Sequence, residues 1–351
     1  MAQLPTVEDV AQLANVSRQT VSNVLNSPGI VRETTRTRVL EAIGQLGYRP
    51  HASARRLRTR KSSTIGIRLE PVRNGISGSV LDTFLHALTE QADSRGMRVM
   101  LFTAEDFAEE IEHIRRLRDG ADVDAFVLTS TAYNDPRVEW LIENEVPFAT
   151  FGRPWGAENT NPRHLWVDVD GRGGVRDATS HLLATGSRAV AYIGWLSGSG
   201  AGDDRRRGWS EALAQHGLEL DGLEKSVEDS VTAGRQAAQE LLARSPRPDA
   251  IVCASDTLAL GARLAASGQG FDDLPIVGFD NTPVAAAIGL SSIEQPLDAV
   301  AGGVLDLLLG PTGNTVRGRG AVNEEPTSRL LAPRLVERRS MHLPLGETTG
   351  L

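Results

Sequence analysis

The sequence predicts an α/β protein in which an all-α helix-turn-helix headpiece precedes two doubly wound parallel sheets. Apolar residues recur at helical spacing within the first 50 residues, and from Ser63 onward short apolar runs alternate with amphipathic segments. This alternation occurs in two similar sets. Because alternating strands and helices form parallel sheets covered by helices, two sets indicate two lobes.

The first two helices are predicted to form the helix-turn-helix. Thr6 has the position of an N-cap, with Asp9 three residues later. Asn15 is expected to end the first helix, because Asn tolerates the left-handed backbone of a sharp turn. Ser17 then caps a second helix over Arg18–Leu25, and about three residues between two short helices are typical of this motif.

A third helix is predicted over Glu33–Leu46, ending at Gly47. Its apolar residues are expected to complete the small core; they are Val39, Leu40, Ile43 and Leu46.

Charge is distributed unevenly along the chain. The first 61 residues hold ten basic and four acidic residues, giving +6, whereas the whole chain has a net charge of -8, so the other 290 residues carry -14. A basic segment attached to an acidic body favours contact of that segment alone with a polyanion. A merely solvated tail is the alternative, but the exposed polar run Arg18-Gln19-Thr20 at the start of the second helix favours DNA.

The runs TVEDVAQLANVSRQTVSNVLN and TRTRVLEAIGQLGYRPHASARRL resemble the N-terminal part of the lactose-repressor (LacI) family of bacterial transcription regulators. The resemblance is dense over residues 6–69 and continues more thinly to about residue 338. Two positions depart from it, since Asn15 stands where many members have Gly and Arg32 where many have a Ser or Thr cap.

The resemblance implies that the second helix lies in the major groove of DNA. Arg18, Gln19 and Asn23 would then read base edges, because Arg forks onto guanine while Gln and Asn pair with adenine. Short polar side chains nearby would contact phosphates without reading sequence; these are Ser17, Thr20, Ser22 and Asn26.

The segment of residues 50–57 resembles the family's hinge helix, which is too short to be stable alone in water. The resemblance implies that it folds when two copies pair on DNA and that Leu57, beside Ala54 and Arg55, enters the minor groove as an apolar wedge. The alternative is a flexible Arg-rich linker. Leu57 has no apolar neighbour in the sequence, which favours the wedge.

Strands and helices of the two lobes are expected as follows. The first set has strands at Thr64–Leu69, Met97–Phe102, Asp124–Leu128 and Val146–Thr150, and helices at Leu81–Arg95, Glu109–Arg118 and Arg137–Glu143. The second has strands at Ala189–Ile193, near Ser226, at Ala250–Ala254 and at Ile276–Phe279, and helices near Gly173–Thr185, Gly208–Gln215, Ala233–Leu242 and Thr257–Ala266.

The run at residues 166–169 is interpreted as a crossover between the lobes, and the resemblance implies further crossings near residues 290–295 and 322–325. The resemblance also implies a bilobed effector domain like that of periplasmic binding proteins. The expected boundaries are 1–49 for the headpiece, 50–61 for the hinge, 62–164 plus 294–322 for the first lobe, 165–293 plus 323–339 for the second lobe and 340–351 for a tail.

Ligands of such sheets bind beyond the carboxyl ends of the strands. Arg205 precedes a Gly-Trp pair and Asp280 ends a strand, which are the positions of effector-contacting residues in the family. An Arg and an Asp facing each other suit the vicinal hydroxyls of a sugar. The further candidates are Arg153, Trp155, Ser255 and Gln295, together with the loop of residues 73–79.

Other signals have simpler interpretations. The glycine-rich run of residues 194–202 matches no nucleotide-binding loop and is interpreted as a flexible lip of the pocket. Asp256 is expected to cap the following helix, and Trp209 is assigned equally to core and pocket. The seven histidines lack metal-ligand spacing, and Cys253 lies in an apolar strand as a buried thiol. No metal or cofactor is expected.

We therefore expect a sequence-specific DNA-binding regulator, a repressor of carbohydrate-utilisation genes controlled by a small sugar-like effector. It would bind a pseudo-palindromic double-stranded operator as a homodimer. A purine-type co-repressor stays open, as does an enzyme or transport-type binding protein with an incidental helical bundle. The start of the chain has no signal-peptide pattern, there is one cysteine, and no apolar run spans a membrane, so a cytoplasmic protein without membrane contact is expected.

Overall fold

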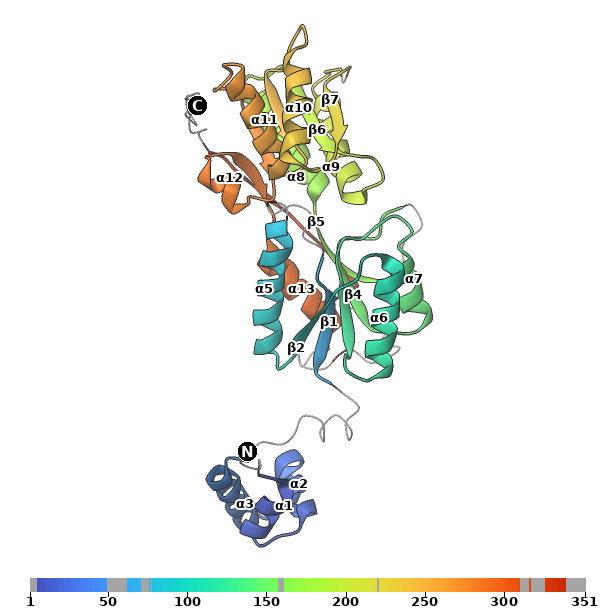
Figure 1. The fold of residues 1–351 in the computed structure, drawn as a ribbon, viewed down its shortest axis with the longest axis vertical. Helices are drawn as coiled ribbons and strands as arrows, with labels where there is room; N and C mark the ends of the chain where they lie inside the picture. The colour runs from blue at the N-terminus through green and yellow to red at the C-terminus, as the bar shows by residue number, and fades with distance from the viewer. Residues whose placement is uncertain are drawn as a thin grey trace, which may run out of the picture. The chain divides into compact units, whose positions relative to one another are not determined.

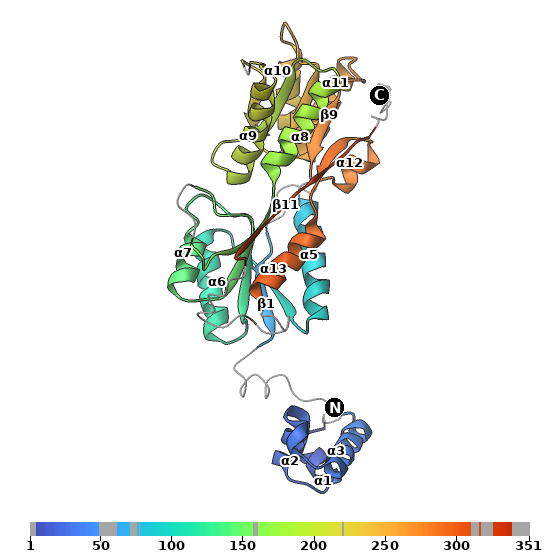
Figure 2. The same cartoon turned by 180° about the vertical axis from the view of Figure 1, so that it is seen from behind.

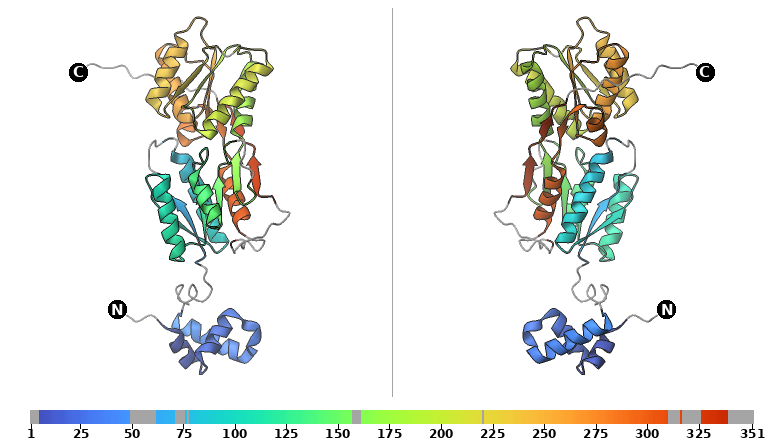
Figure 3. Two further views of the ribbon diagram at one scale, coloured as in Figure 1. Left: turned by 90° about the vertical axis from the view of Figure 1, so that its right-hand side faces the viewer. Right: turned by 90° about the vertical axis from the view of Figure 1, so that its left-hand side faces the viewer.

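The computed structural model describes residues 5–48, 62–70, 76, 78–156, 161–219, 221–309, 316 and 326–338. The chain divides into two compact units, Met1–Ser62 and Ser63–Leu351. The first unit is helical, and the second contains two sheets with helices on both faces (Figures 1 and 3).

The N-terminal unit contains α1 (Val7–Leu13), α2 (Arg18–Asn26), the 3₁₀ turn η1 (Pro28–Ile30) and α3 (Glu33–Leu46). Its core is formed by small and β-branched side chains from all three α-helices, closed by one aromatic ring: Val10, Ala11, Ala14, Val21, Val24, Val39, Ala42 and Tyr48. The predicted third helix is confirmed, and Gly47 ends it with a left-handed φ of 62°.

The prediction is wrong for one core residue of this unit. Leu40 is 50% exposed, whereas Ile43 and Leu46 pack against the core as expected. Leu40 follows the buried Val39 by one residue, which turns it about 100° away from the inward stripe of a helix with 3.6 residues per turn.

The first lobe of the second unit is built on a sheet with the strand order β11-β5-β4-β3-β1-β2, in which every pairing is parallel. Its strands are β1 (Thr64–Arg68), β2 (Arg98–Phe102), β3 (Ala125–Leu128), β4 (Phe148–Phe151), β5 (Leu165–Val169) and β11 (Ser328–Leu331). Its helices are α5 (Gly78–Ser94), α6 (Phe107–Asp119), α7 (Pro136–Glu143) and α13 (Leu297–Leu308).

The side chains of this sheet alternate between two separate cores, as the pleat of a strand requires. Ile65 and Val127 pack with α5 and α13 on one face. Phe126 and Leu128 pack with Ile114 of α6 and with α7 on the other. Both faces are therefore buried, which explains why the strands read as continuous apolar runs.

The second lobe has the strand order β12-β10-β9-β8-β6-β7, parallel except for the antiparallel β10–β12 pair. Its strands are β6 (Val190–Trp195), β7 (Glu224–Val227), β8 (Ala250–Cys253), β9 (Ile276–Phe279), β10 (Ser291–Glu294) and β12 (Arg334–Val336). Its helices are α8 (Gly171–Ala184), α9 (Gly200–Gln215), α10 (Val231–Leu242), α11 (Asp256–Gly268) and α12 (Pro283–Ala287). The pairs α8–α9 and α10–α11 cover opposite faces (Figures 1 and 2).

The predicted strands and helices of both lobes are confirmed to within three residues, with one exception at α9. This helix begins at Gly200 and not near Gly208, so part of the run interpreted as a flexible lip is helical. Ser199 accepts a hydrogen bond from the Gly202 amide at 3.2 Å and caps it. The helices α12 and α13 lay outside the sequence prediction.

Two of the expected lobe boundaries are also wrong. β5 pairs with β4 and β11, so residues 165–169 belong to the first sheet. β11 belongs to the same sheet and β12 to the other, so the last crossing falls between Leu331 and Arg334. The apolar pattern marked strands at the crossings, but pairing partners decide which lobe a strand belongs to. The residues 322–325 themselves lie outside the described part of the chain.

Candidate functional site

The start of α2 is fixed by caps on both helices of the N-terminal pair. The Thr6 hydroxyl accepts a hydrogen bond from the Asp9 amide at 3.3 Å, and the Asp9 carboxylate accepts one from the Thr6 amide at 2.7 Å, forming a capping box. Asn15 has a φ of 51°, as its place in the turn predicts. The Ser17 hydroxyl then accepts from the Thr20 amide at 3.1 Å and begins α2.

This turn presents a polar face of α2 to solvent. Val21 and Val24 point into the core, whereas Arg18 and Gln19 are exposed and Asn23 is half-buried. The Gln19 side-chain amide donates to the Asn23 carbonyl oxygen at 3.0 Å, so the two amides form one unit. A helix face of this size and chemistry can enter a major groove and pair with base edges.

Arg18 is the cation on this face, and its side chain is 68% exposed. It forms an ion pair with Glu8 of α1, which lowers the pKa of the Glu8 carboxyl through the hydrogen bond from Arg18. Arg32 gives α3 no side-chain cap, as expected. The predicted hinge residues Ala54, Arg55 and Leu57 lie outside the described residues, as does the side chain of Asn26.

A cavity of about 1070 Å³ lies between the two lobes of the second unit. The first lobe lines it with the ends of β1 and β3 and the start of α5, and the second lobe with the ends of β6 and β7 and the residues that cap α9 and α10. All these strands meet the cavity at their carboxyl ends, where parallel sheets bind ligands. The polar and aromatic lining residues are Arg68, Glu70, Ser79, Asp82, Phe84, Thr129, Ser130, Trp195, Ser199, Glu228, Asp229 and Ser230.

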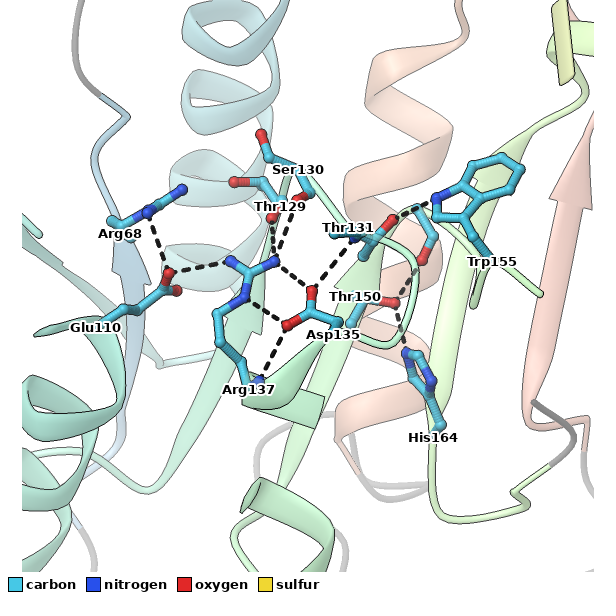
Figure 4. Close-up of polar contacts among 12 residues, drawn as sticks. Arg68, Glu110, Thr129, Ser130, Thr131, Asp135, Arg137, Thr150, Trp155 and His164 are labelled. Atoms are coloured by element: carbon cyan, nitrogen blue, oxygen red, sulfur yellow. Dashed lines mark hydrogen bonds and ion pairs between the residues drawn. The ribbon is translucent and has the colours of Figure 1, made fainter. Parts of the chain in front are cut away.

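A buried ionic network supports the first-lobe wall (Figure 4). Arg137 is fully buried and donates to Glu110 at 3.0 Å and to both carboxylate oxygens of Asp135, at 2.9 and 2.6 Å. It also donates to the carbonyl oxygens of Thr129 and Ser130, each at 3.1 Å. Because these two residues line the cavity, Arg137 fixes the shape of its wall from behind.

Arg68 connects this network to the cavity. One terminal nitrogen lies 3.3 Å from the Glu110 carboxylate, and the other forms an ion pair with Glu70. Its Nε is buried and has no hydrogen-bond partner among the described residues. Burial raises the pKa of Glu110, while Arg137 and Arg68 oppose that shift.

The second-lobe wall is held by residues that the sequence had marked as effector contacts. Arg205 is nearly buried, with its guanidinium carbon 3.6 Å from the ring centroid of Phe279 and 4.8 Å from that of Trp195, which lines the cavity. It donates to the Ala254 carbonyl oxygen at 2.6 Å. The hydroxyl of Ser255 donates to Asp229, another lining residue, and also caps α11.

Asp280 lies behind Arg205, at 3.9 Å from its guanidinium. Gln295 donates to the Asp280 carboxylate at 2.7 Å. Burial raises the pKa of Asp280 to about 7, against the opposing effect of Arg205.

Arg153 and Trp155 contact the start of α9. Arg153 donates to Asp168 at 2.6 Å and lies 3.2 Å from Asp204 of the other lobe. The Trp155 ring packs so closely on Gly200 that a Cβ there would lie 2.1 Å from the ring. None of the six predicted effector residues is among the described residues that line the cavity, although Arg205 and Ser255 contact residues that are.

The contacts of Asp256 and Trp209 decide the roles of these two residues. Asp256 is not the cap of α11; its buried carboxylate accepts from the Thr282 amide at 2.7 Å and from the Ser292 hydroxyl at 2.6 Å. Trp209 is core, since it is fully buried and stacks on Tyr192 with ring centroids 5.5 Å apart.

Known proteins match both units. The profile described as bacterial regulatory proteins, lacI family, matches residues 6–51, and the one described as periplasmic binding protein-like domain matches residues 179–341. HTH-type transcriptional regulator CelR of Thermobifida fusca is 35% identical over 349 residues, which cover 96% of this chain and 98% of that protein. The chain belongs to the LacI family.

Solved structures agree with this family. The structure of a transcriptional regulator CelR–cellobiose complex has 30% identity and a TM-score of 0.68, covering 96% of this chain and 100% of that one. The lac repressor dimer bound to operator and the anti-inducer ONPF has 24% identity and a TM-score of 0.77, covering 96% and 99%, and shares the fold.

Membership of the LacI family confirms the predicted DNA-binding transcription regulator and the two-sheet fold class, and identifies a regulator in place of an enzyme. Within the described residues of this LacI-family regulator, no helix has the length and apolarity that a membrane span needs.

The cavity between the two lobes of this LacI-family regulator is lined by residues that the sequence prediction missed, above all Arg68, Glu70, Thr129 and Asp229. A signal for them existed, because each ends or closely follows a strand of the predicted sheets. The family's Arg and Asp positions fall behind this wall, since Arg205 contacts the lining residue Trp195 and Asp280 lies behind Arg205.

Proposed function

We propose that this regulator represses carbohydrate-utilisation genes from the cytoplasm, where bacterial DNA lies, and that a sugar-like effector bound between its lobes controls it. The observation that carries the DNA-binding part is the exposed face of α2, with Arg18 beside the joined amides of Gln19 and Asn23. Arg18, Gln19 and Asn23 read base edges in this proposal, and Ser17, Thr20, Ser22 and Asn26 contact phosphates.

Two copies bind a pseudo-palindromic operator in this proposal, since symmetric half-sites match a two-fold dimer. Support comes from the lac repressor, whose solved structure is a dimer on its operator. The hinge of residues 50–61 orders on DNA and inserts Leu57 into the minor groove, with Ala54 and Arg55 beside it.

The effector binds in the cavity, where Trp195 offers a flat face and Arg68, Glu70 and Asp229 offer polar contacts. Support comes from the size of the cavity, which is at the upper end of small-molecule sites and has room for more than one sugar ring. CelR, the relative described above, has been solved with cellobiose. The six predicted effector residues act on this site from behind in the proposal. Four of them support the second-lobe wall, namely Arg205, Asp280, Gln295 and Ser255, and two support the start of α9, namely Arg153 and Trp155.

The DNA-binding part is tested by gel shift on a palindromic fragment obtained by selection from random sequence. Arg18→Ala should weaken binding by about 1–3 kcal/mol, a loss of about 5- to 150-fold, and relax the preference at one base position of each half-site. Arg38→Ala is the matched control, because Arg38 is an exposed arginine of α3 in the same unit. It should leave the base preference unchanged, and an unchanged preference in Arg18→Ala as well would contradict the proposal.

The effector part is tested by a thermal-shift screen of monosaccharides, disaccharides, nucleobases and nucleosides. Trp195→Ala and Arg205→Ala should abolish or strongly reduce the shift caused by the best compound. Trp140→Ala changes a tryptophan of α7 outside the cavity and should retain the shift. A full shift in both site variants would show that the cavity is not the effector site.

A further inference from the structure

The charged side chains that line the effector cavity are mostly acidic. Among the described residues these are Glu70 and Asp82 from the first lobe, Glu228 and Asp229 from the second, and one cation, Arg68. The hydroxyl of Ser255 holds the Asp229 carboxylate, and Thr129 donates to Glu70 at 3.4 Å. At neutral pH the described wall therefore has an excess of negative charge.

Arg68, the one cation among the described lining residues, is already neutralised. The terminal nitrogens of Arg68 pair with Glu70 and with Glu110, and the Arg68 side chain is only 6% exposed. The second arginine of the network, Arg137, is buried against Asp135 and Glu110 and lines no part of the cavity. A phosphate entering the cavity would find no described arginine or lysine free to pair with it.

Three helices begin at the cavity and oppose this acidity in part. Gly78 of α5, Ser199 before α9 and Ser230 before α10 all line the wall. Each helix N-terminus acts as roughly half a positive charge. Together they offset less than two of the carboxylates, so the acidic character of the wall persists.

The hydrogen-bonding groups at this wall suit a ligand rich in neutral hydroxyls. Hydroxyl groups donate to carboxylates, and they also accept hydrogen bonds. The buried Nε of Arg68 is a donor without a described partner at the wall of this cavity. A phosphate or carboxylate on the ligand brings acceptors and negative charge to a surface that already holds both.

We infer that the effector is an uncharged polyhydroxyl compound and that Glu70 and Asp229 exclude its phosphorylated and carboxylated forms. This inference rests on the proposed effector function and specifies which compounds that site accepts. Like charges placed together at a binding surface repel each other, so exclusion on the order of 100-fold or more is expected.

Isothermal titration of the full-length protein tests the inference with matched probes. The probes are glucose and cellobiose, each beside its 6-phosphate, together with glucuronic acid and the neutral sugars that give a thermal shift. At least one neutral sugar should bind, and each anionic form should bind at least about 100-fold more weakly.

Charge-removing variants identify the residues responsible. Glu70→Gln leaves Arg68 with one carboxylate partner and should increase the affinity for the phosphorylated form about tenfold or more, while the neutral sugar loses affinity. Asp229→Asn should narrow the difference in affinity between the neutral sugar and its phosphorylated form. Glu90→Gln is the control, because Glu90 is an exposed acid of α5 that does not line the cavity. This variant should have the wild-type ratio of affinities for the neutral and the phosphorylated sugar.

The possible failures are distinct. Equal or tighter binding of a phosphorylated sugar to the wild type overturns the inference and leaves the effector site standing. The inference is also overturned, and the effector site also stands, if Glu70→Gln and Asp229→Asn both keep the wild-type ratio of affinities for the neutral and the phosphorylated sugar. If no neutral or anionic sugar binds at all, the proposed sugar effector is itself wrong, and the inference fails with it.

Discussion

Asp280 is a carboxyl placed where a negative charge is costly. It directly follows β9 with a φ of 107°. Gln295 donates a hydrogen bond to its side chain at 2.7 Å, while the Arg205 guanidinium stays at 3.9 Å. Burial outweighs these contacts and raises its pKa to about 7. The ionised form is thus held at a free-energy cost near neutral pH.

The pH dependence of stability should reveal this cost. Between its unfolded pKa of 3.8 and about 7, native Asp280 binds a proton that the unfolded chain does not, so its contribution to stability is lost as pH rises through this window. Asp280→Asn cannot titrate. Its melting temperature relative to wild type should therefore rise between pH 5 and pH 8, by at least about 2 °C.

Asp93→Asn is the matched control for this measurement, since Asp93 is an exposed acid of α5 in the same unit. Its melting curve should follow the wild type at every pH. Parallel pH profiles for wild type and Asp280→Asn would mean that the carboxyl is ionised without cost.

Residue-scale prediction worked best where a local rule decides the outcome. Thr6, Asn15, Ser17 and Gly47 all have the capping or turn role expected from their types, because such roles depend on neighbours within four residues. The cavity depends on segments far apart in the chain. Arg68 and Asp229 are separated by 161 positions, and no local pattern brings them together.

At the scale of elements, the glycines of α9 explain why its start was missed. Glycine has poor helix propensity, so the run around Gly200 reads as a loop. In the fold these glycines have neighbours that exclude a side chain. Gly200 lies against Trp155, and a Cβ on Gly208 would lie 2.1 Å from the Arg172 carbonyl oxygen of α8. Packing between helices overrides propensity here, and sequence periodicity contains no information about it.

Gly208→Ala should therefore destabilise the second unit. The obstructing atom belongs to the backbone of α8, which cannot move aside like a flexible side chain, so we expect a loss of about 1–3 kcal/mol in the free energy of unfolding. Chemical denaturation monitored by tryptophan fluorescence measures it, since Trp209 is the next residue.

The matched control is Gly268→Ala at the end of α11, where a Cβ meets nothing within 4 Å. Alanine has the better helix propensity, so this variant should be neutral or up to about 1 kcal/mol more stable. A Gly208→Ala protein as stable as the control would refute the close α8–α9 contact.

At the scale of the whole molecule, the two units differ in charge sign. The first 61 residues carry +6 and the remainder -14, so the chain repels polyanions over most of its length and attracts them at one end. The cavity in the acidic unit is also negatively charged, since its described lining residues include four carboxylates and one paired arginine. The affinity for the operator and the affinity for the effector are thus expected to depend differently on ionic strength.

Titrations from 50 to 200 mM salt test this division within one protein. Operator affinity should fall by about 10³- to 10⁵-fold, because arginines that contact phosphates release condensed counterions. Binding of an uncharged effector releases none, so its affinity should change less than about twofold over the same range. An effector affinity that rises tenfold with added salt would show a repelled anion in the cavity, and an operator affinity that ignores salt would remove phosphate contact from the N-terminal unit.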